Sequence, residues 1–434
     1  MKQRFISSFL TVVGILLSFT ASAENWPNWR GPTGQGISLE SGLPVEWSAT
    51  KNVRWKVELP GPGNSTPVVW GDKVFLAQAS GPDGQRRALM CFDRRTGKKL
   101  WNSGVTYREK ETTHKTNPQC SASPATDGER VYVSFASAGV FCFDMDGRMI
   151  WRRDLGRQDH IWGNGASPLI HQNVVLLNFG PGPDTFLIAM DKLTGETKWK
   201  KEEPGGRSGK DLKPGENKRE AWKGSWSDPV PFQQDGKTLM LMTYPGRIFA
   251  FDPLTGKEIW TCGGINPLVY TSPIHAEGIA VGMGGFRGNT IAVRLGGKGD
   301  VTETHRLWRH EKTQQRIGSG VIHDAHIYIL DDPGLAECID LKTGATVWQE
   351  QLKGPGKNRQ NWSSMVAADG KLYAVNQGGD AFVLKASPKF DLLSVNPMGE
   401  KVIGSIAVSN GDLFIRGHKH LFCIGGPKKT ARAN

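Results

Sequence analysis

Long hydrophobic runs are almost missing from this 434-residue sequence, and their scarcity limits where the chain can reside. The exception lies at the N-terminus, where an apolar run from Phe5 to Phe19 follows Lys2 and Arg4 and ends in the Ala-Ser-Ala of residues 21–23. Because the run is shorter than the ~20 residues of a membrane span and ends in small residues, residues 1–23 are predicted to be a secretory signal peptide. We therefore expect an exported chain in the periplasm or cell envelope, with no transmembrane segment after cleavage.

Patterns typical of catalytic and metal sites are also missing. The sequence has no G-x-S-x-G nucleophile motif, and His114, His160, His171 and His275 show no short metal-ligand spacing. The glycine-rich stretch 282–286 is not followed by a helical pattern, as a phosphate-binding loop would be. The sequence therefore predicts no catalytic residue and no metal ligand.

Cysteine is scarce, with six residues of which no two are adjacent. Four of them occupy the same apolar position in the repeats described below and are expected to be core side chains: Cys91, Cys142, Cys338 and Cys423. Equivalent positions in different repeats are too far apart for a disulfide. Cys120 and Cys262 lie outside this pattern, so a bridge between these two stays open.

Acidic residues are outnumbered, with 42 Asp and Glu against 54 Lys and Arg, which gives a net charge of +12. The excess is spread over turns except in residues 198–223, which we interpret as a basic loop insertion, and in a basic tail, 426–434, expected to be disordered. A solvated basic surface explains this distribution, and attraction to anionic polymers is the alternative. We do not expect a nucleic-acid partner.

Glycine and tryptophan are abundant, with 54 and 15 residues, and they recur in a fixed phrase. A short apolar strand is followed by Asp, two variable residues, Thr-Gly, three residues and Trp. The copies, one of them shortened, give these repeat positions: Asp93, Gly97 and Trp101; Asp144 and Trp151; Asp191, Gly195 and Trp199; Asp252, Gly256 and Trp260; Asp340, Gly344 and Trp348. Such a turn needs one residue at positive φ, and Asp and Thr oxygens accept from its amides. Each phrase therefore predicts a hairpin whose Trp docks on the next sheet.

A second phrase, Ser-Pro or a variant followed by an alternating strand, precedes each hairpin and brings the unit to four strands. Four short strands every 40–50 residues are typical of a propeller blade. Trp55 and Trp308 extend the series of Trp anchors, and Trp55 has no hairpin before it. We predict an all-β, eight-bladed β-propeller over residues 47–425, closed by the strand around Trp55, after an N-terminal extension, 24–46. Seven blades is the alternative if the unit starting at Asn361 forms no full sheet.

The repeat from Ala189 to Trp199 resembles the PQQ-like (pyrroloquinoline quinone-like) β-propeller repeat family, and the resemblance covers nearly the whole mature chain. The segments 26–32 and 117–131 are similar to exported members from planctomycete-like bacteria. One branch of the family comprises quinoprotein dehydrogenases, which hold PQQ and Ca²⁺ at the propeller centre near a Glu, an Asn and an Asp. The other resembles the propeller component of the outer-membrane barrel assembly machinery, a scaffold without catalytic residues.

The sequence departs from both branches. It lacks the adjacent cysteines of many quinoprotein alcohol dehydrogenases, and acidic residues are sparse in the segments entering the blades, whereas Ca²⁺ favours several carboxylate oxygens. It also has no lipidation cysteine after residue 23. We expect no cofactor, with PQQ and calcium as the alternative.

Residues that precede the inner strands are expected to ring one mouth of the central channel, where aromatic and amide side chains could orient a ligand. These candidates are Asn64, Gln119, Trp162, Asn164, Trp222, Trp226, Tyr270, Arg316, Asn361 and Trp362. Plugging of the channel by the same tryptophans is the alternative. The leading hypothesis is a monomeric, non-catalytic envelope propeller that binds a protein partner or a small ligand. A small quinoprotein dehydrogenase and a carbohydrate- or polyanion-binding propeller are the alternatives.

Overall fold

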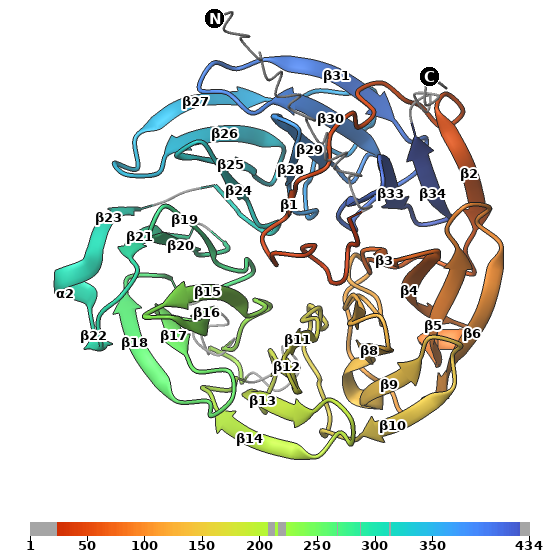
Figure 1. Cartoon of the computed structure of the whole chain (residues 1–434), viewed down its shortest axis with the longest axis horizontal. Helices are drawn as coiled ribbons and strands as arrows, with labels where there is room; N and C mark the ends of the chain where they lie inside the picture. The colour runs from red at the N-terminus through yellow and green to blue at the C-terminus, as the bar shows by residue number, and fades with distance from the viewer. Residues whose placement is uncertain are drawn as a thin grey trace, which may run out of the picture.

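Eight antiparallel sheets of four strands surround a central axis in the computed structural model, so the predicted eight-bladed β-propeller is confirmed (Figure 1). The structure describes residues 24–206, 213–215, 223–266, 268–286, 288–311 and 314–425. In the described ranges, no helix has both the length and the apolar character needed to cross a membrane.

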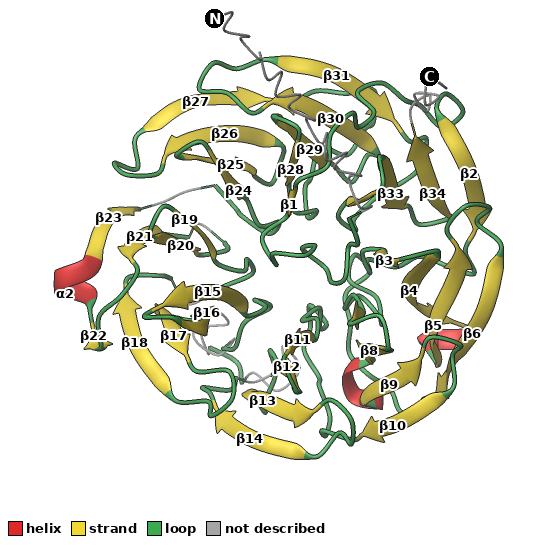
Figure 2. Ribbon diagram, in the orientation of Figure 1, coloured by secondary structure: helices red, strands yellow, loops and turns green. Residues whose placement is uncertain are grey.

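The blades follow one another in chain order, each running from an inner strand at the axis to an outer strand at the rim (Figure 2). Blades 1 to 4 comprise β3 (Val68–Trp70), β4 (Lys73–Ser80), β5 (Arg86–Asp93) and β6 (Lys99–Thr106); β7 (Ala125–Thr126), β8 (Arg130–Ser134), β9 (Val140–Asp144) and β10 (Met149–Arg153); β11 (Leu169–His171), β12 (Val174–Phe179), β13 (Phe186–Asp191) and β14 (Thr197–Glu202); β15 (Val230–Gln234), β16 (Lys237–Tyr244), β17 (Arg247–Phe251) and β18 (Glu258–Gly263).

Blades 5 to 8 comprise β19 (Ile274–Ala276), β20 (Ile279–Met283), β21 (Thr290–Arg294) and β23 (Arg306–His310); β24 (Val321–His323), β25 (His326–Leu330), β26 (Leu335–Asp340) and β27 (Thr346–Gln351); β28 (Val366–Ala368), β29 (Lys371–Val375), β30 (Asp380–Lys385) and β31 (Leu392–Pro397); β32 (Ala407–Ser409), β33 (Asp412–Arg416), β34 (His420–Gly425) and β2 (Val53–Glu58). Short additions are β1 (Ile37–Ser38), β22 (Gly299–Asp300), α2 (Thr302–His305) and the 3₁₀ turns Pro82–Gly84 and Ala136–Ala138. The unit starting at Asn361 forms a full sheet, β28 to β31, which excludes the seven-bladed alternative.

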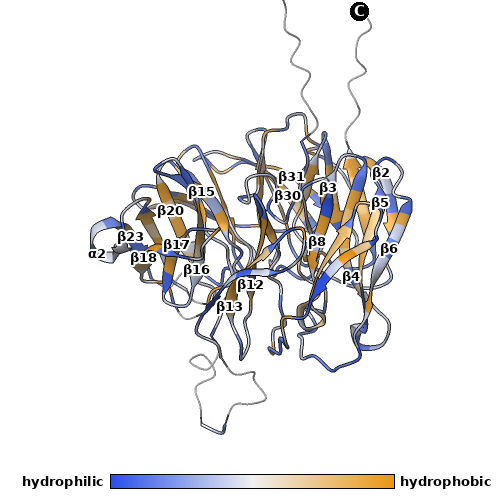
Figure 3. Cartoon of the chain, turned by 60° about the horizontal axis from the view of Figure 1, so that its bottom comes forward, coloured by the Kyte–Doolittle hydropathy of each residue, from blue (hydrophilic) through white to orange (hydrophobic). Residues whose placement is uncertain are grey.

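The ring is closed by the two ends of the propeller chain. Strand β2 pairs antiparallel with β34, with Val57 opposite Leu421, and so supplies the outer strand of blade 8. The prediction that the strand around Trp55 completes the last blade is therefore confirmed. This pairing leaves no blade with an unfilled fourth place, and hydrophobic residues gather within and between the blades (Figure 3).

At the rim, the tryptophans of six blades pack on the hairpin turn of the next blade. The indole of Trp151 donates from Nε1 to Lys192 O at 3.1 Å, and a Cβ added to Gly195 would lie 2.8 Å from its ring. The same bond is made by Trp55 to Arg94 O, Trp101 to Met145 O, Trp199 to Pro253 O, Trp308 to Leu341 O and Trp348 to Ser387 O. Trp260 instead donates to Gln234 Oε1 within its own blade, at 3.1 Å.

The turns themselves are held by the aspartate of the phrase. Asp93 Oδ1 accepts from the backbone N–H of Thr96 at 2.8 Å and from its hydroxyl at 2.7 Å, while Gly97 has a φ of +72°. These bonds satisfy amides that the turn would otherwise leave unpaired. Asp191, Asp252 and Asp340 accept equivalent amide bonds.

The recurrent cysteine position is explained by the tryptophan opposite it. Cys91 is paired across the sheet with Trp101, and Cys142, Cys338 and Cys423 face the tryptophans of their own blades. In three other blades an alanine takes this place opposite Trp199, Trp260 and Trp308, so the position requires a small side chain. Cys120 and Cys262 are both buried and form no disulfide, which excludes the bridge left open between them.

Two predicted segments are placed differently or fall outside the described residues. The basic insertion was expected to begin at residue 198, but β14 extends to Glu202 because Trp199 needs an outer strand to dock from. Residues 207–212 and 216–222 of that insertion, the predicted tail 426–434 and the predicted signal peptide 1–23 lie outside the described residues.

The N-terminal extension crosses the end of the channel, and we call residues 24–40 the strap (Figure 1). Trp26 exchanges two backbone hydrogen bonds of 2.9 Å with Val69 in blade 1, and β1 pairs in parallel with β28 in blade 7. Gln35 Oε1 accepts from the backbone N–H of His275 in blade 5 at 2.8 Å. The strap therefore ties together blades on opposite sides of the axis.

Candidate functional site

A closed circle of hydrogen bonds surrounds the axis, with one residue from each blade. We call these residues the hydroxyl ring: Thr66, Ser123, Ser167, Asp228, Ser272, Ser319, Ser364 and Ser405. In every link the backbone N–H of one member donates to the side-chain oxygen of the next, at 2.7–3.1 Å, and Ser405 returns to Thr66. Since every member is buried, the ring satisfies backbone amides at the narrow centre that no strand pairs.

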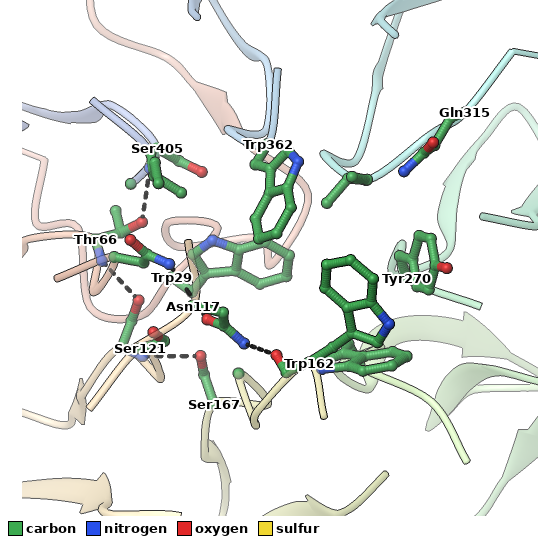
Figure 4. A pocket seen from close by; sticks show the side chains of 17 residues that line it. Trp29, Thr66, Asn117, Ser121, Trp162, Ser167, Tyr270, Gln315, Trp362 and Ser405 are labelled. Atoms are coloured by element: carbon green, nitrogen blue, oxygen red, sulfur yellow. Dashed lines mark hydrogen bonds between the residues drawn. The ribbon is translucent and has the colours of Figure 1, made fainter. Parts of the chain in front are cut away.

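A pocket of about 160 Å³ rests on this ring (Figure 4). Its floor includes ring members Thr66, Ser123, Ser167 and Ser405 together with Trp29 of the strap. Its walls come from the loops that enter the blades, and each of the eight blades contributes to the lining: Asn64, Asn117, Trp162, Trp226, Tyr270, Gln315, Trp362 and Ile403.

The strap holds Trp29 in place through the adjacent Arg30. This buried guanidinium donates to Met365 O at 2.7 Å and Gln35 O at 2.6 Å, and also to Gly320 O. Burial lowers the pKa of Arg30 to about 9. Because its partners are backbone carbonyls of blades 6 and 7 and of the strap itself, Arg30 fixes the strap against the propeller.

The aromatic side chains are positioned by one another and by the loops. Trp226 donates from Nε1 to Gly163 O at 2.9 Å and lies edge-on to Tyr270, with ring centroids 5.2 Å apart. Trp162 packs against His114 at 4.3 Å between centroids, and its carbonyl accepts from Asn117 Nδ2 at 2.7 Å. These contacts make the wall rigid enough to present defined aromatic faces.

Three buried polar atoms of the lining have no hydrogen-bond partner among the described residues. They are the indole Nε1 of Trp162, the indole Nε1 of Trp362 and Oδ1 of Asn64. Asn64 already uses its amide group, which donates to Thr116 O at 2.8 Å. Two donors and one acceptor of the lining are thus unsatisfied, although buried polar groups are normally paired.

A wider cavity of about 570 Å³ continues the pocket outward, and we call it the bowl. The two share Trp162, Tyr270, Gln315 and Trp362. The bowl also contains His114, Lys115 and Asp332, whereas the described residues that line the inner pocket carry no formal charge.

Burial is the largest influence on the pKa values of two side chains in the bowl, Asp332 and His114. It raises the pKa of the Asp332 carboxyl to about 6, against the effect of an accepted bond from the Asn361 amide. It also lowers the pKa of His114, to which the neighbouring Lys115 and Lys401 contribute. Both groups therefore favour their neutral forms more than they would in water.

The family model described as outer membrane protein assembly factor BamB matches residues 37–106, 85–350 and 297–386. The chain belongs to this family. The resemblance to PQQ-like propellers is thereby confirmed. BamB of Burkholderia pseudomallei is 23% identical over 333 residues, covering 67% of this chain and 76% of that protein. A polyvinylalcohol dehydrogenase of Pseudomonas is 22% identical over 195 residues, covering 42% of this chain but 29% of the enzyme.

Solved structures reproduce the fold of this BamB-family chain. BamB from Moraxella catarrhalis superposes with a TM-score of 0.58 at 13% identity, covering 87% of this chain and 98% of that one. A quinohemoprotein alcohol dehydrogenase from Comamonas testosteroni reaches 0.61 at 12% identity, covering 93% and 81%. At these identities the likeness shows the propeller fold alone.

The inner pocket does not fit the cofactor of quinoprotein enzymes. Ca²⁺ takes six to eight oxygen ligands, several from carboxylates, but the pocket's described lining supplies amide and hydroxyl oxygens and no carboxylate. The described residues also include no cluster of three or more His, Cys, Asp or Glu able to hold a metal. PQQ itself is an anion, and the described lining offers it no cation.

Five of the ten residues predicted from the sequence line this pocket of the BamB-family chain: Asn64, Trp162, Trp226, Tyr270 and Trp362. Gln119 and Asn164 instead line a small neighbouring cavity. Trp222 lies outside the described residues.

Arg316 and Asn361 are buried for structural reasons and do not line the pocket. Arg316 Nε donates to Asp331 Oδ1 at 3.1 Å, and the same guanidinium bonds Glu337 and Thr290. Asn361 Nδ2 donates to Leu330 O at 2.7 Å. The structure places these two residues inside blade 6 and its neighbours, where each satisfies buried groups, and outside the lining of the pocket.

Trp29, Asn117, Gln315 and the hydroxyl ring were not predicted from the sequence. Gln315 and Asn117 lie one and two residues from the predicted Arg316 and Gln119, so the loops were right and the registers wrong. The recurrent Ser-Pro phrase held the signal for the ring, since five of its members belong to that phrase or its variants.

Proposed function

We propose that this chain is an exported, non-catalytic propeller of the periplasm or cell envelope that binds a protein partner or a ligand through its central mouth. The observation that carries the proposal is the inner pocket. Its described lining has no formal charge, takes aromatic and amide side chains from seven blades and Ile403 from the eighth, and includes three unpaired polar atoms. Such a wall can bind and orient a ligand, and its described residues include no histidine, carboxylate, lysine or cysteine that could act as an acid, base or activated nucleophile.

The match to the BamB family supports a scaffold, since the printed name of that family is an assembly factor. The dehydrogenase relatives make a quinoprotein oxidoreductase the competing function. The chemistry of the lining disfavours it, as neither Ca²⁺ nor an anionic quinone finds its usual ligands there.

A redox assay separates the two functions. The purified mature chain, supplied with PQQ and Ca²⁺, is mixed with alcohols, aldoses and polyvinyl alcohol while reduction of a dye is followed. We expect no turnover above that of heat-denatured protein, with a working quinoprotein dehydrogenase as the positive control. Turnover that stops when calcium is chelated would refute the non-catalytic assignment.

Binding through the mouth is tested by placing a photo-crosslinking residue at Gln360 of the bowl and, as a control, at Leu254 on the exposed rim. In native envelope extract, Gln360 should give discrete crosslinked species that Leu254 does not. Identical patterns from both positions would contradict a binding role for the mouth.

A further inference from the structure

The inner pocket and the bowl form one continuous path from the surface of the propeller to the hydroxyl ring. They share four wall residues, and Trp29 and ring members close the inner end. At about 160 and 570 Å³, the two spaces together fall within the ~300–1,000 Å³ of small-molecule sites. An elongated ligand could therefore enter with one end leading.

The unpaired hydrogen-bonding groups of the lining specify what a ligand in the inner pocket must carry. Trp162 Nε1 and Trp362 Nε1 can only donate, and Asn64 Oδ1 can only accept. A hydrocarbon would leave all three unpaired, at a cost for each buried group. A hydroxyl group does both, so several hydroxyls on one ligand would satisfy the whole set.

The absence of charge in the described lining further restricts the class of ligand that can bind. Because the described lining is uncharged, an anion or cation entering the inner pocket would lose its hydration without gaining a counter-charge. The positive excess of the chain lies elsewhere, and at the bowl Lys115 is accompanied by the carboxyl of Asp332. The ligand that fits is neutral.

The aromatic side chains of the wall add a further condition on the ligand, which must have a surface that packs against aromatic rings. Trp29, Trp162, Trp226, Trp362 and Tyr270 surround the space with aromatic faces, and the labelled side chains among them converge on the opening in Figure 4. The electron-rich face of an aromatic ring attracts the weakly positive C–H groups of a pyranose. A sugar ring combines such C–H faces with equatorial hydroxyls that donate and accept.

We infer that the pocket binds the terminal unit of a neutral saccharide chain, with the next units in the bowl. This inference rests on the proposed function, because it names the ligand of the same site. It assigns Trp362 and Trp162 both a stacking face and a donated hydrogen bond, Asn64 the accepted bond, and Trp29 the inner limit of the pocket.

The test is calorimetric titration of the mature chain with cellotetraose, maltotetraose and N-acetylated chitotetraose, with dextran sulfate as the anionic comparison. At least one neutral tetrasaccharide should bind, and its affinity should stay constant when salt is raised about tenfold, since no charge pair is involved. Trp362→Ala should weaken binding about tenfold or more, and Trp362→Phe should weaken it less because it keeps a stacking face.

The matched control is Trp101→Phe, which changes a rim tryptophan that docks on Met145 and does not line the pocket. It should leave binding unchanged. If Trp362→Ala fails to fold by thermal unfolding, Trp362→Phe and Trp29→Phe carry the comparison with Trp101→Phe.

Absence of binding by all three neutral tetrasaccharides would overturn the inference, and so would binding of dextran sulfate alone. Neither outcome touches the non-catalytic assignment, which fails only by turnover in the redox assay. The saccharide inference would also be refuted if Trp362→Phe and Trp29→Phe bound the tetrasaccharide as strongly as the Trp101→Phe control. The ligand would then lie outside the pocket.

Discussion

The rim and the axis of this propeller are built on opposite rules. At the rim, tryptophans from six blades donate to a backbone carbonyl in the turn of the next blade, and small Cys or Ala residues face the same tryptophans. At the axis, the eight loops that line the pocket contribute five kinds of side chain, Asn, Trp, Tyr, Gln and Ile, in no regular order around the ring. Repetition thus serves the contacts that hold neighbouring blades together, including the hydroxyl ring, whereas the lining of the inner pocket varies from blade to blade.

Replacement of a rim tryptophan should produce the largest loss of stability. Trp151→Ala empties the site formed by Gly195 and the carbonyl of Lys192, and we expect it to lower the free energy of unfolding by about 3–5 kcal/mol. Trp362→Ala at the axis removes a half-buried ring and should cost about 1 kcal/mol. Denaturant unfolding of both variants measures the two changes in the free energy of unfolding. Equal changes would contradict the prediction that the rim contributes more to stability than the axis.

The next largest effect should come from the strap, the element that joins the axis to distant blades. Arg30→Ala leaves carbonyls of Met365, Gln35 and Gly320 without their donor, and we expect a loss of about 2 kcal/mol. Limited proteolysis should then cut within residues 24–46 while the blades resist.

The rim offers a matched control for Arg30. Arg95 is exposed and pairs with the exposed Asp72, so Arg95→Ala should change stability by less than about 0.5 kcal/mol and open no new cleavage site. Cleavage of both variants at the same places would mean that Arg30 does not hold the strap.

The sequence allowed the rim to be predicted and the axis only in outline. The phrase around Asp191, Gly195 and Trp199 encodes a turn and its docking within about ten residues, so each copy can be read independently. The mouth loops have no period, and their registers depend on contacts such as Arg316 with Asp331 and Glu337, which only the folded chain reveals.

The strap shows the same limit more clearly. It occurs once, and its β1 pairs with β28, a strand more than 300 residues away in the sequence. Its segment from Trp26 to Gly31 carries only a resemblance to exported family members, and nothing local could place Trp29 under the pocket.

Two glycines separate the cost of positive φ from the cost of tryptophan docking. Gly195 and Gly236 have φ of +75° and +73°, but an added Cβ would meet Trp151 at 2.8 Å in the first case and nothing within 4 Å in the second. We expect Gly236→Ala to lower the free energy of unfolding by about 1 kcal/mol and Gly195→Ala to lower it by about 2 kcal/mol or more. Thermal unfolding of the pair checks this, and equal costs would show that the rim tolerates displacement of its tryptophan.

The smallest effect should come from the one carboxyl in the hydroxyl ring. Asp228 stands where seven blades have Ser or Thr, and its Oδ1 accepts from the backbone N–H of Ser167 at 2.8 Å. Burial raises the pKa of Asp228 well above its usual value, more than that accepted bond lowers it. The native state therefore holds a proton that the unfolded chain releases near pH 4, and stability falls as the pH rises above that value.

Asp228→Ser should retain the ring, because a Ser hydroxyl accepts the same bond in the other blades, while it removes the carboxyl that resists ionisation. We expect the variant to match the wild type at about pH 4 and to exceed it by about 1 kcal/mol at pH 7 and above. Denaturant unfolding across this range measures both values. A variant that is less stable at every pH would mean that the longer Asp side chain is needed to span a wider gap in the ring, and that the axis tolerates variation even less than the rim.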